Sequence, residues 1–457
     1  MTSRPLLIVI LAAGKGTRMK SARPKVLHKI AGRSMLAHVL ALAAAVRGAG
    51  LAVVVGPGME DVAVATLQLA PAARVFVQHS QLGTADAVLA ARQAIAAHEG
   101  DVLVLYADTP LIEAATIARL VDALDHGAGI AVLGFESASP GGYGRLLTGA
   151  DGALLAVREA KDASEAERRI RLCNSGVMAF RLGSLLDVLS AIGNQNAKRE
   201  YYLTDAIEIA RGQGARAAVI VCPEDEVLGI NSREELAAAE EIWQRRARSK
   251  IMTEGATLIA PQTVWLSFDT VVGSDVVIEP NVFLGPGVVI EDGATIHSFC
   301  HLEGARLRKG SEIGPFARMR PGADIGLRAK VGNFVEVKNT RLGEGAKANH
   351  LSYLGDGSVG AGANIGAGTI FCNYDGFLKH RTEIGAGAFI GSNTSLVAPV
   401  RVGDGAYIGS GSVITRDVPA DALALERSPQ AERPGWAAKF RALMARRKAK
   451  TGERGAA

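Results

Sequence analysis

Aliphatic side chains recur at every sixth position in the C-terminal part of the chain, and this period constrains the fold more than any other feature. The seventeen positions fall in three runs: Val272, Ile278, Leu284, Ile290, Ile296 and Leu302; Ile313, Met319, Ile325, Val331 and Val337; Ile384, Ile390, Leu396, Val402, Ile408 and Ile414. Glycine is frequent at the turns between them. Such a hexapeptide period predicts a β-helix, in which each inward aliphatic residue packs on the coils above and below.

A second inward column of smaller residues accompanies the first: Val276, Val282, Val288, Ala294 and Cys300. This column bears on a cluster that could pass for metal ligands, His297, Cys300 and His301. Cys300 shares the inward column, whereas each histidine adjoins an inward aliphatic residue and therefore points outward. The spacing argues against a metal site at this cluster.

The first 230 or so residues follow a different pattern, in which apolar strands alternate with alanine-rich helical segments. Strands are expected at Leu6–Leu11, Leu51–Val55, Val102–Tyr106 and Ile130–Phe135, with helical segments such as His38–Val46 and Ala85–Ala97 between them. This alternation predicts an α/β domain with a largely parallel sheet. Ligands of such sheets bind at the carboxyl ends of the strands.

A long helix is expected to connect the two halves. Residues 232–253 read SREELAAAEEIWQRRARSKIMT, and Ser232 with Glu235 forms a capping-box pattern at its start. We therefore divide the chain into an α/β domain at 1–231, a connecting helix at 232–253, and a β-helix domain with a basic tail at 254–457.

The stretch LAAGKGTRM, residues 11–19, follows the first strand and suggests a phosphate cradle. Glycine allows a tight turn and a close approach to a ligand, and Lys15 and Arg18 add positive charge. The spacing matches neither common phosphate motif: Gly16 stands where a P-loop has Ser or Thr, and Met19 stands where the dinucleotide motif has its last glycine. The motif therefore indicates phosphate without naming the ligand.

Three further polar residues could complete a nucleotide site. Asp108 follows a strand in YADTP, and Asn231 precedes the connecting helix in GINSREE. A carboxylate and an amide oxygen can hold Mg²⁺ beside substrate phosphates, because Mg²⁺ keeps several waters and needs few protein ligands. Lys25, in ARPKVL, would supply positive charge. Taken singly, each residue has a simpler reading as a turn, capping or exposed residue.

The hexapeptide register slips between Val337 and Val359, and again between Ile365 and Ile384. We expect inserted loops there, which hold NHLSYLGD (349–356) and FCNYDG (371–376), and loops on a rigid scaffold often carry function. His350 is a candidate general base, because imidazole can take a proton near neutral pH. An isolated loop histidine is more often solvated, but Arg320, Lys338 and Tyr353 suggest a seat for a phosphorylated amine.

Composition limits the class of protein. No apolar run approaches the ~18 residues of a membrane span, and the start of the chain reads as a strand rather than a signal peptide. The four cysteines form no CxxC pair, which favours reducing cytoplasm. The net charge of +5 is concentrated in the tail, WAAKFRALMARRKAKTGER, which we interpret as a solvated basic helix or a frayed terminus.

The motifs together resemble one family over nearly the whole chain. LAAGKGTRM with PKVL, QLGTADA, YADTPL, GYGR, EAKDA, NSG and GIN precede hexapeptide coils with RPGA, GNFVEVK, NHLSYLGD, NIGAGTIFCNYDG and a tail containing RSPQ. In this order they are similar to the bacterial bifunctional N-acetylglucosamine-1-phosphate uridyltransferases/glucosamine-1-phosphate acetyltransferases. The resemblance implies a Rossmann-like nucleotidyltransferase domain followed by a left-handed parallel β-helix.

For the first half, the resemblance implies that UTP and N-acetylglucosamine-1-phosphate react on Mg²⁺ held by Asp108 and Asn231, with Arg18 and Lys25 neutralising the triphosphate. The sugar phosphate oxygen would attack the α-phosphorus of UTP and release pyrophosphate, with no covalent protein intermediate. The other implied contacts are Leu11, Ala12, Ala13, Gly14, Gln78, Gly83, Thr84, Tyr106 and Ala107 for the nucleotide side, and Gly144, Glu159 and Asn174 for the sugar pocket.

For the second half, the resemblance implies that His350 deprotonates glucosamine-1-phosphate, whose amine then attacks acetyl-CoA. Arg320, Lys338, Tyr353 and Asn364 would hold the sugar phosphate, and Ala367, Asn373, Tyr374, Ser392, Ser410 and Arg427 would line the acetyl-CoA site. It also implies a homotrimer with shared sites, and acetylation before uridyl transfer in cell-wall precursor synthesis. Two positions depart from the family pattern: Ala107 replaces a common glycine and Ser410 a frequent alanine.

Three alternatives stay open at this point. Another sugar-nucleotide pyrophosphorylase with an appended β-helix would not need His350, Tyr353, Asn373 and Tyr374. A catalytically inactive regulatory subunit would not need Lys25, Asp108 and Asn231 intact. Nucleic-acid binding rests only on the basic tail, without an aromatic stacking platform, so we expect no nucleic acid and no membrane as partners.

Overall fold

A computed structural model describes residues 4–46, 49–181, 183 and 185–453 of the chain. The chain forms two compact units. The first comprises Met1–Val271 with Phe283–Val288, and the second comprises Val272–Val282 with Val289–Ala457. The first unit thus continues past residue 231 and includes the connecting helix.

The first unit contains a nine-stranded mixed sheet whose main path runs β11-β7-β10-β6-β1-β4-β5. Its strands are β1 (Leu6–Leu11), β4 (Ala49–Val55), β5 (Arg74–Val77), β6 (Asp101–Tyr106), β7 (Ile130–Glu136), β8 (Arg145–Thr148), β9 (Leu154–Arg158), β10 (Leu172–Phe180) and β11 (Ala217–Cys222), and a separate hairpin consists of β2 (Lys29–Ile30) and β3 (Arg33–Ser34). The central strand β1 pairs in parallel with β4 and β6, whereas β10 runs antiparallel to β6 and β7. The sheet is therefore mixed: β11-β7 and β6-β1-β4-β5 pair in parallel as predicted, whereas β8, β9 and β10 pair antiparallel with their neighbours.

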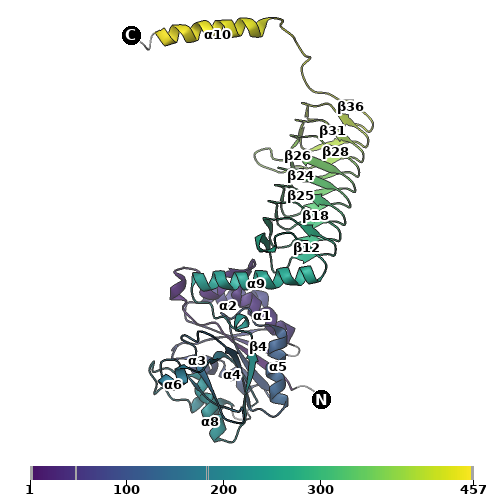
Figure 1. Cartoon of the computed structure of the whole chain (residues 1–457). Helices are drawn as coiled ribbons and strands as arrows, with labels where there is room; N and C mark the ends of the chain where they lie inside the picture. The colour runs from purple at the N-terminus through teal and green to yellow at the C-terminus, as the bar shows by residue number, and fades with distance from the viewer. Residues whose placement is uncertain (1–3, 47–48, 182, 184, 454–457) are drawn as a thin grey trace. The chain divides into compact units, whose positions relative to one another are not determined.

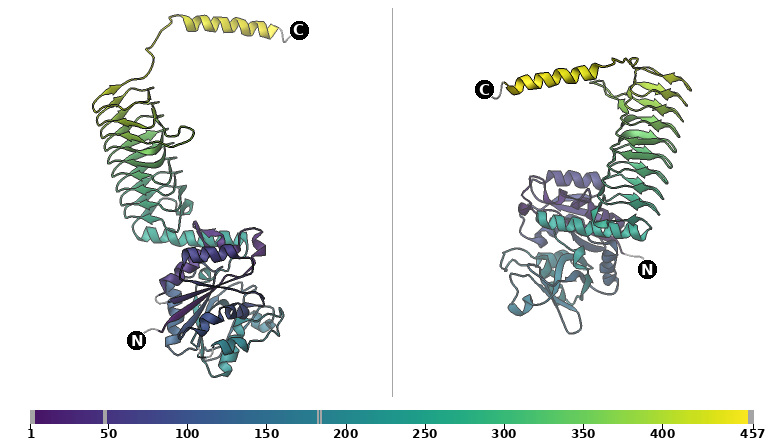
Figure 2. Two further views of the ribbon diagram at one scale, coloured as in Figure 1. Left: turned by 180° about the vertical axis from the view of Figure 1, so that it is seen from behind. Right: turned by 45° about the horizontal axis from the view of Figure 1, so that its top comes forward.

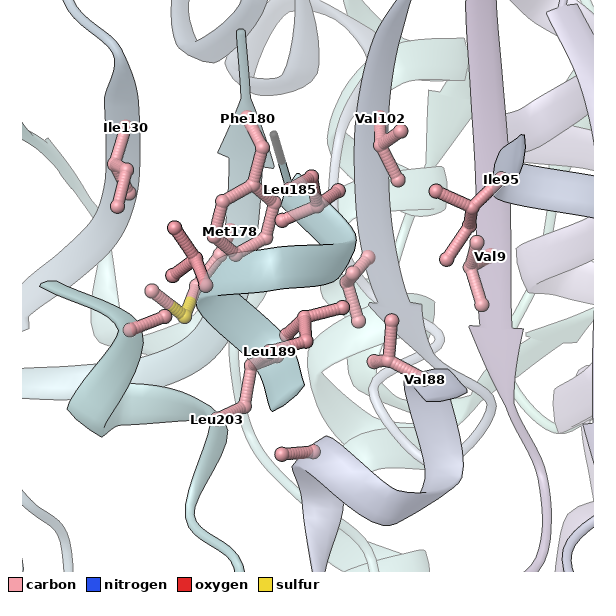
Figure 3. Packing of buried hydrophobic residues seen from close by; sticks show 14 of the residues in the cluster. Val9, Val88, Ile95, Val102, Ile130, Met178, Phe180, Leu185, Leu189 and Leu203 are labelled. Carbon is pink, nitrogen blue, oxygen red and sulfur yellow. The ribbon is translucent and has the colours of Figure 1, made fainter. Parts of the chain in front are cut away.

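Helices cover both faces of this sheet (Figure 1). The helices of this unit are α1 (Met35–Ala45), α2 (Glu60–Leu69), α3 (Thr84–Ala90), α4 (Arg92–Ala96), α5 (Ala114–Asp125), α6 (Glu165–Arg168), α7 (Leu185–Ser190), α8 (Ala206–Gly212) and α9 (Arg233–Thr253). Because β1 is buried on both sides, its residues alternate between two cores: Leu7 and Val9 pack with α3, α4, α7 and α8, while Ile8 and Ile10 pack with α1, α2 and α5. Figure 3 shows the first of these cores, in which Val9 lies beside Ile95 and Leu189 lies beside Leu203.

One buried ion pair lies at the amino-terminal end of β6, opposite the carboxyl ends of the strands at which such sheets bind ligands. Asp101, at the start of β6, is 1% exposed and accepts hydrogen bonds from Arg181 Nε at 2.8 Å and Nη2 at 2.5 Å. The same guanidinium donates to Leu124 O and Asp125 Oδ1. Loss of Arg181 would therefore leave a carboxylate almost without solvent and without its main partner.

We expect Arg181→Met to lower the free energy of unfolding of the first unit by about 3 kcal/mol, the usual cost of leaving one charge of a buried pair alone. Urea unfolding followed by far-ultraviolet circular dichroism measures this loss, since most helices belong to that unit. A loss below about 1 kcal/mol would mean that Arg4, 4.0 Å from Asp101, is a sufficient substitute.

The connecting helix is confirmed as α9, and its start matches the capping-box prediction. Ser232 Oγ accepts from the backbone N–H of Glu235, and the Glu235 carboxylate accepts from the backbone N–H of Ser232. Ala239 of α9 packs in a small core with Ile30, Met35 and Leu111. The helix is therefore part of the first unit's packing and not a free linker.

Short parallel strands stack in successive coils in the second unit (Figures 1 and 2). The strands of this part of the chain are β12 (Thr257–Leu258), β13 (Val264–Leu266), β14 (Val271–Val272), β15 (Val277–Ile278), β16 (Val282–Leu284), β17 (Val289–Ile290), β18 (Thr295–Ile296), β19 (His301–Leu302), β20 (Arg306–Leu307), β21 (Glu312–Ile313), β22 (Arg318–Met319), β23 (Asp324–Ile325), β24 (Lys330–Asn333), β25 (Glu336–Leu342), β26 (Lys347–His350), β27 (Tyr353–Val359), β28 (Asn364–Ile365), β29 (Ile370–Cys372), β30 (Thr382–Ile384), β31 (Phe389–Ile390), β32 (Ser395–Val397), β33 (Val400–Val402), β34 (Tyr407–Ile408), β35 (Val413–Ile414) and β36 (Leu423–Ala424). This is the predicted left-handed parallel β-helix.

The inward columns are confirmed almost completely. Of the seventeen six-residue positions, all are buried except Val272, which is partly exposed at the start of the repeat. Ile296 pairs with Ile313, and Ile313 pairs with Val331, so each coil buries its aliphatic residue against the next. Cys300 is 2% exposed in the second column, and His297 lies outside the core between the carboxylates of Glu279 and Glu312.

The first register slip is not an inserted loop, and that prediction was wrong. Residues 349–356 lie in β26, β27 and the tight corner between them. The period breaks because one step of the coil is five residues long, from Val337 to Leu342 and from Leu354 to Val359. β25 and β27 each run on as a seven-residue strand across this step.

The second slip is a true insertion. Residues 373–381 leave the stack between β29 and β30, so that Ile365 pairs with Ile390 across the longer coil. An isolated bridge between Tyr374 and Lys379 folds this loop back on itself, and Asp375 accepts from the backbone N–H groups of Phe377 and Leu378. The 373–381 loop is thus an ordered excursion from the β-helix.

After the last coil the chain forms α10 (Trp436–Glu453), which confirms the helical interpretation of the basic tail. Its apolar residues Trp436, Phe440 and Leu443 are exposed, and the rings of Trp436 and Phe440 stack at 5.0 Å. Within the described residues, no helix combines the length and the apolar character that crossing a membrane requires.

Candidate functional sites

A pocket of about 300 Å³ opens at the carboxyl ends of β1 and β6. This is the edge at which parallel sheets bind ligands. Eleven of the residues that the sequence singled out line it: Leu11, Ala12, Ala13, Gly14, Lys15, Lys25, Gln78, Gly83, Thr84, Tyr106 and Asp108. They come from segments far apart in the chain, and β1, β6 and α3 bring them together.

Two positions in the segments that form this pocket require glycine for steric reasons. Gly16 has a φ of 61°, and a Cβ there would lie 2.5 Å from Lys25 Cβ. Gly83 has a φ of 127°, and its Cβ would lie 2.5 Å from the carbonyl oxygen of Tyr201. Any other residue would push these segments apart. The glycines therefore let the 11–19 turn close over Lys25 and let α3 begin against residue 201.

Lys25 lies between the two proposed metal ligands. Its ammonium is 2.5 Å from Asp108 Oδ2 and 2.9 Å from Asn231 Oδ1, and its side chain is 7% exposed. The backbone N–H of Ile230 donates to the carbonyl of Asp108, which holds the two segments together. The two side-chain oxygens thus converge on one cation, which is a donor set that also suits Mg²⁺.

The three residues assigned to the sugar pocket also lie together. Asn174 donates its backbone N–H to the carbonyl of Gly144 at 2.8 Å, and a Cβ on Gly144 would lie 3.3 Å from Glu159 Oε1. Burial raises the pKa of Glu159, which Lys198 and a bond from Thr204 partly offset. Burial, followed by the charges of Asp108 and Glu159, raises the pKa of Tyr106 as well. The hydroxyl of Tyr106 therefore stays protonated near both Asp108 and Glu159.

Arg18, Ala107 and Asn231 are not among the described residues that line the pocket, whereas the polar residues Gln81 and Glu200 line it without having been predicted. Arg18 is exposed and does not line the pocket in the described structure. Ala107 is fully buried, so its extra methyl packs in the core instead of crowding the ligands. Gln81 lines the pocket and donates to the carbonyl of Ala13, and Glu200 lines it too. QLGTADA begins with Gln81, but nothing local distinguishes it from Gln78.

In the second unit, His350 ends β26 on the outside of the β-helix. Its Nδ1 lies 2.8 Å from Asn333 Oδ1, the residue in register on the preceding coil. The chain then turns through Leu351, which has a φ of 50°, and continues into β27 at Tyr353. Asn333 can hold the imidazole with its other nitrogen free. Asn333 was not predicted from the sequence, although the coil repeat places it beside His350.

Cationic side chains gather beside Tyr353. Arg320 donates to Glu336, which pairs in register with Tyr353, and Lys338 lies two residues further along β25. Lys379 of the 373–381 loop lies close enough to Lys338 for this cationic neighbour to lower the pKa of Lys379. A cluster of cationic side chains of this kind attracts an anion. Nothing local in the sequence pointed to Lys379.

The proposed acetyl-CoA residues form a column along one corner of the β-helix. The N–H of Asn393 donates to the Ala367 carbonyl, the N–H of Gly411 donates to the Ser392 carbonyl, and Arg427 Nη1 donates to the Ser410 carbonyl. Ser392, Ser410 and Arg427 are exposed there. Asn364 begins β28 on the coil after β26, Asn373 directly follows β29, and Tyr374 is exposed in the 373–381 loop. The surface is therefore long and open, as an extended ligand would need.

Comparison with family models divides the chain in the same way. A MobA-like NTP transferase domain matches residues 8–173. A bacterial transferase hexapeptide model of six repeats matches residues 269–304 and 381–416. The first covers the sheet with the nucleotide-type pocket, and the second covers coils on either side of His350.

Curated relatives match along almost the entire chain. A protein named bifunctional protein GlmU from Azorhizobium caulinodans is 60% identical over 97% of this chain and 98% of its own length. Proteins of the same name from Xanthobacter autotrophicus and Agrobacterium fabrum are 59% and 55% identical, over 98% and 96% of this chain and 100% and 96% of their own.

Proposed function

The chain belongs to the family of bifunctional GlmU proteins, and we propose that each of its two units catalyses one of the family's two reactions. It is a uridyltransferase and an acetyltransferase that makes UDP-N-acetylglucosamine for cell-wall synthesis. Acetyl-CoA and UTP are its co-substrates. The observation that carries the assignment of sites is that Asp108 and Asn231 both contact Lys25, which lines the pocket of the first unit with Asp108.

We assign uridyl transfer to the pocket of the first unit. The oxygen of the N-acetylglucosamine-1-phosphate phosphate attacks the α-phosphorus of UTP, and the bond to pyrophosphate breaks. The 11–14 turn and Gln78 offer polar backbone and amide groups to the nucleotide, and Lys25 neutralises phosphate charge. Positioning and charge neutralisation suffice for this chemistry, so no nucleophilic side chain is required.

Asp108 and Asn231 are the residues that would hold Mg²⁺. Their two oxygens already converge on a cation, the Lys25 ammonium, which supports the fit of this donor set. A bound Mg²⁺ would supply charge stabilisation to the triphosphate. The Lys25 ammonium would then separate from Asp108 and Asn231. It would form an ion pair with the triphosphate instead. Arg18, exposed on the same turn, would join them only when the nucleotide is bound.

We assign acetyl transfer to the outside of the second unit. His350, held by Asn333, takes a proton from the amine of glucosamine-1-phosphate as that amine attacks the thioester carbonyl, and the thiolate of CoA leaves. Arg320, Lys338 and Lys379 surround a place for the sugar phosphate. The open column of Ala367, Ser392, Ser410 and Arg427 would hold the acetyl-CoA chain.

We propose a homotrimer in the cytoplasm. An exposed ladder of stacked rings, Phe299, Phe316 and Phe334, runs up one corner with centroids 4.9 and 5.2 Å apart and leads to Leu351 beside His350. An apolar ladder of this kind is typical of an interface with other copies. The four cysteines are free, three of them buried, which suits a reducing compartment.

One assay tests the proposed function directly. Purified protein receives acetyl-CoA, glucosamine-1-phosphate, UTP and Mg²⁺, and free thiol and pyrophosphate are followed together. Both products are expected, with thiol release preceding pyrophosphate. If thiol is released without pyrophosphate, the assignment of uridyl transfer is wrong. If pyrophosphate is released only when N-acetylglucosamine-1-phosphate is supplied, the protein is the pyrophosphorylase without acetyl transfer.

We expect the two activities to separate when the chain is divided after α9. A fragment of residues 1–253 should retain uridyl transfer, because α9 packs on the first unit and a cut at 231 would remove that packing. Residues 254–457 should acetylate glucosamine-1-phosphate and sediment as a trimer. Activity assays and analytical ultracentrifugation measure both.

Two outcomes would contradict the division. A folded but inactive 1–253 fragment would mean that uridyl transfer needs the second unit. A fully active monomer of 254–457 would mean that the acetyl-CoA site is not shared between chains. In the intact protein, dilution should reduce acetyl transfer before uridyl transfer, because only the former depends on assembly.

A further inference from the structure

We propose that Asp356 is a positioning residue that couples the sugar-phosphate and acetyl-CoA subsites of the second unit. The proposal rests on the acetyl-transfer site described above. Asp356 lies near the middle of β27, is 7% exposed, and touches side chains assigned to both substrates. It was not among the residues that the sequence singled out, because NHLSYLGD offers an aspartate with no partner nearby in the chain.

Both oxygens of this carboxylate are occupied. Oδ1 accepts from Asn339 Nδ2 at 2.8 Å, and Oδ2 accepts from Asn373 Nδ2 at 2.5 Å. The Lys338 ammonium approaches both oxygens, at 3.4 and 3.2 Å. Lys338 belongs to the proposed phosphate seat, and Asn373 belongs to the proposed acetyl-CoA side. One buried anion therefore joins groups that would bind different substrates.

The site requires a carboxylate at this position. Every partner is a donor, so an uncharged amide would have to turn its own N–H groups toward at least one of them. Burial opposes ionisation, but the bonds from Asn339, Lys338 and Asn373 outweigh it and hold the pKa of Asp356 below its usual range. The φ of 54° at Asp356 shows that the backbone takes an unusual conformation where these groups meet.

This geometry lets Asp356 position two side chains, Lys338 and Asn373. It holds the Lys338 ammonium at a fixed place beside Lys379, and it holds the Asn373 amide, which also lies 3.5 Å from the Tyr353 hydroxyl. A residue that served only the phosphate seat would affect only the sugar phosphate. Loss of the Asp356 carboxylate should therefore weaken the binding of both substrates. It should leave proton transfer by His350, which Asn333 holds in place, largely unchanged.

Asp356→Asn tests this coupling in the full-length protein. We expect the KM for glucosamine-1-phosphate and the KM for acetyl-CoA each to rise about tenfold, as for the loss of a charge-assisted hydrogen bond, with kcat changed less. The Kd for CoA, measured by calorimetry, should rise in parallel. Uridyl transfer should stay as in the wild type. Asp324→Asn is the matched control, because Asp324 accepts Arg308 Nε and Nη2 at 2.9 and 3.0 Å on another coil of the same β-helix.

Lys338→Met supplies a second test if the first variant does not fold, as its thermal unfolding would reveal. This change removes one donor from Asp356, and we expect the Kd for CoA to rise about threefold although Lys338 itself is assigned to the sugar phosphate. An unchanged Kd for CoA in every folded variant would overturn the coupling. A wild-type protein that releases no thiol from acetyl-CoA would instead overturn the acetyl-transfer assignment.

Discussion

Asp108→Ala is expected to abolish pyrophosphate release, by about 10³-fold or more, while thiol release stays within about twofold of the wild type. The substitution removes one of the two oxygens that converge on the Lys25 ammonium, 2.5 Å from Asp108 Oδ2. It would leave Asn231 alone to hold Mg²⁺ and would leave Lys25 without its charged partner. Acetyl transfer needs no metal, since an amine attacks a thioester. Separate assays for pyrophosphate and thiol measure the two effects.

Asp122→Ala is a suitable control, because Asp122 is an exposed carboxylate on α5 in the same unit. It should leave both activities unchanged. The metal assignment also predicts that a chelator stops pyrophosphate release from the wild type without affecting thiol release, and that Asp108→Ala weakens Mn²⁺ binding in the presence of UTP. Wild-type pyrophosphate release by Asp108→Ala at ordinary Mg²⁺ would contradict the assignment.

Much of the fold could be predicted from the sequence because it depends on regular patterns. The inward aliphatic residues of the β-helix repeat at a fixed spacing, and Ile313, Met319 and Ile325 are fully buried as the period requires. The strand at Leu6–Leu11 matches β1 residue for residue. The Ser232–Glu235 capping box marks the start of α9, because both halves of that motif lie within one turn. Patterns of this kind involve residues close together in the chain, so they can be recognised from the amino-acid sequence alone.

The misreading of residues 349–356 has a physical reason. A slip of the six-residue period can come from an insertion or from a shortened step, and the spacing alone does not separate the two. In the coils, β25 and β27 continue through a five-residue step, so His350 stands at the end of a strand and not in a projecting loop. His350 is thus more firmly placed than the sequence suggested, which favours a catalytic over a solvated role.

The remaining features of the two sites could not be predicted from the sequence, because they depend on contacts between segments far apart in the chain. Lys25 meets Asn231 across 206 positions, although each residue was chosen for its own chemistry. Asp356 ends the motif NHLSYLGD without a partner nearby in the chain, and Lys379 belongs to no motif, so the importance of both depends on where the 373–381 loop folds back. The family resemblance named residues that contact ligands. It said little about the residues behind them, which hold those contacts in place.

His350→Ala is expected to lower the turnover of acetyl transfer by about 10²–10⁴-fold, the usual contribution of a positioned base, and to leave uridyl transfer unchanged. Asn333→Ala should cause a smaller loss, about tenfold, because it frees the imidazole without removing it: Asn333 Oδ1 lies 2.8 Å from His350 Nδ1. Steady-state rates of thiol release with saturating acetyl-CoA measure this order. His301→Ala, on the outside of an earlier coil, provides the control and should retain both activities.

The dependence of these variants on pH decides between base catalysis and a structural role. A rise in pH converts more of the glucosamine-1-phosphate ammonium into the free amine, and the free amine needs no base before it attacks the thioester. His350→Ala should therefore regain part of its activity at high pH, while the wild type gains much less because His350 already performs that step. A structural histidine would leave a defect of the same size at every pH, with a lowered melting temperature. If the variant sediments like the wild type but is impaired to the same extent at every pH, His350 is not the general base. Substrate binding by the cationic cluster of Arg320, Lys338 and Lys379 would then be the main contribution of the site to the rate of acetyl transfer.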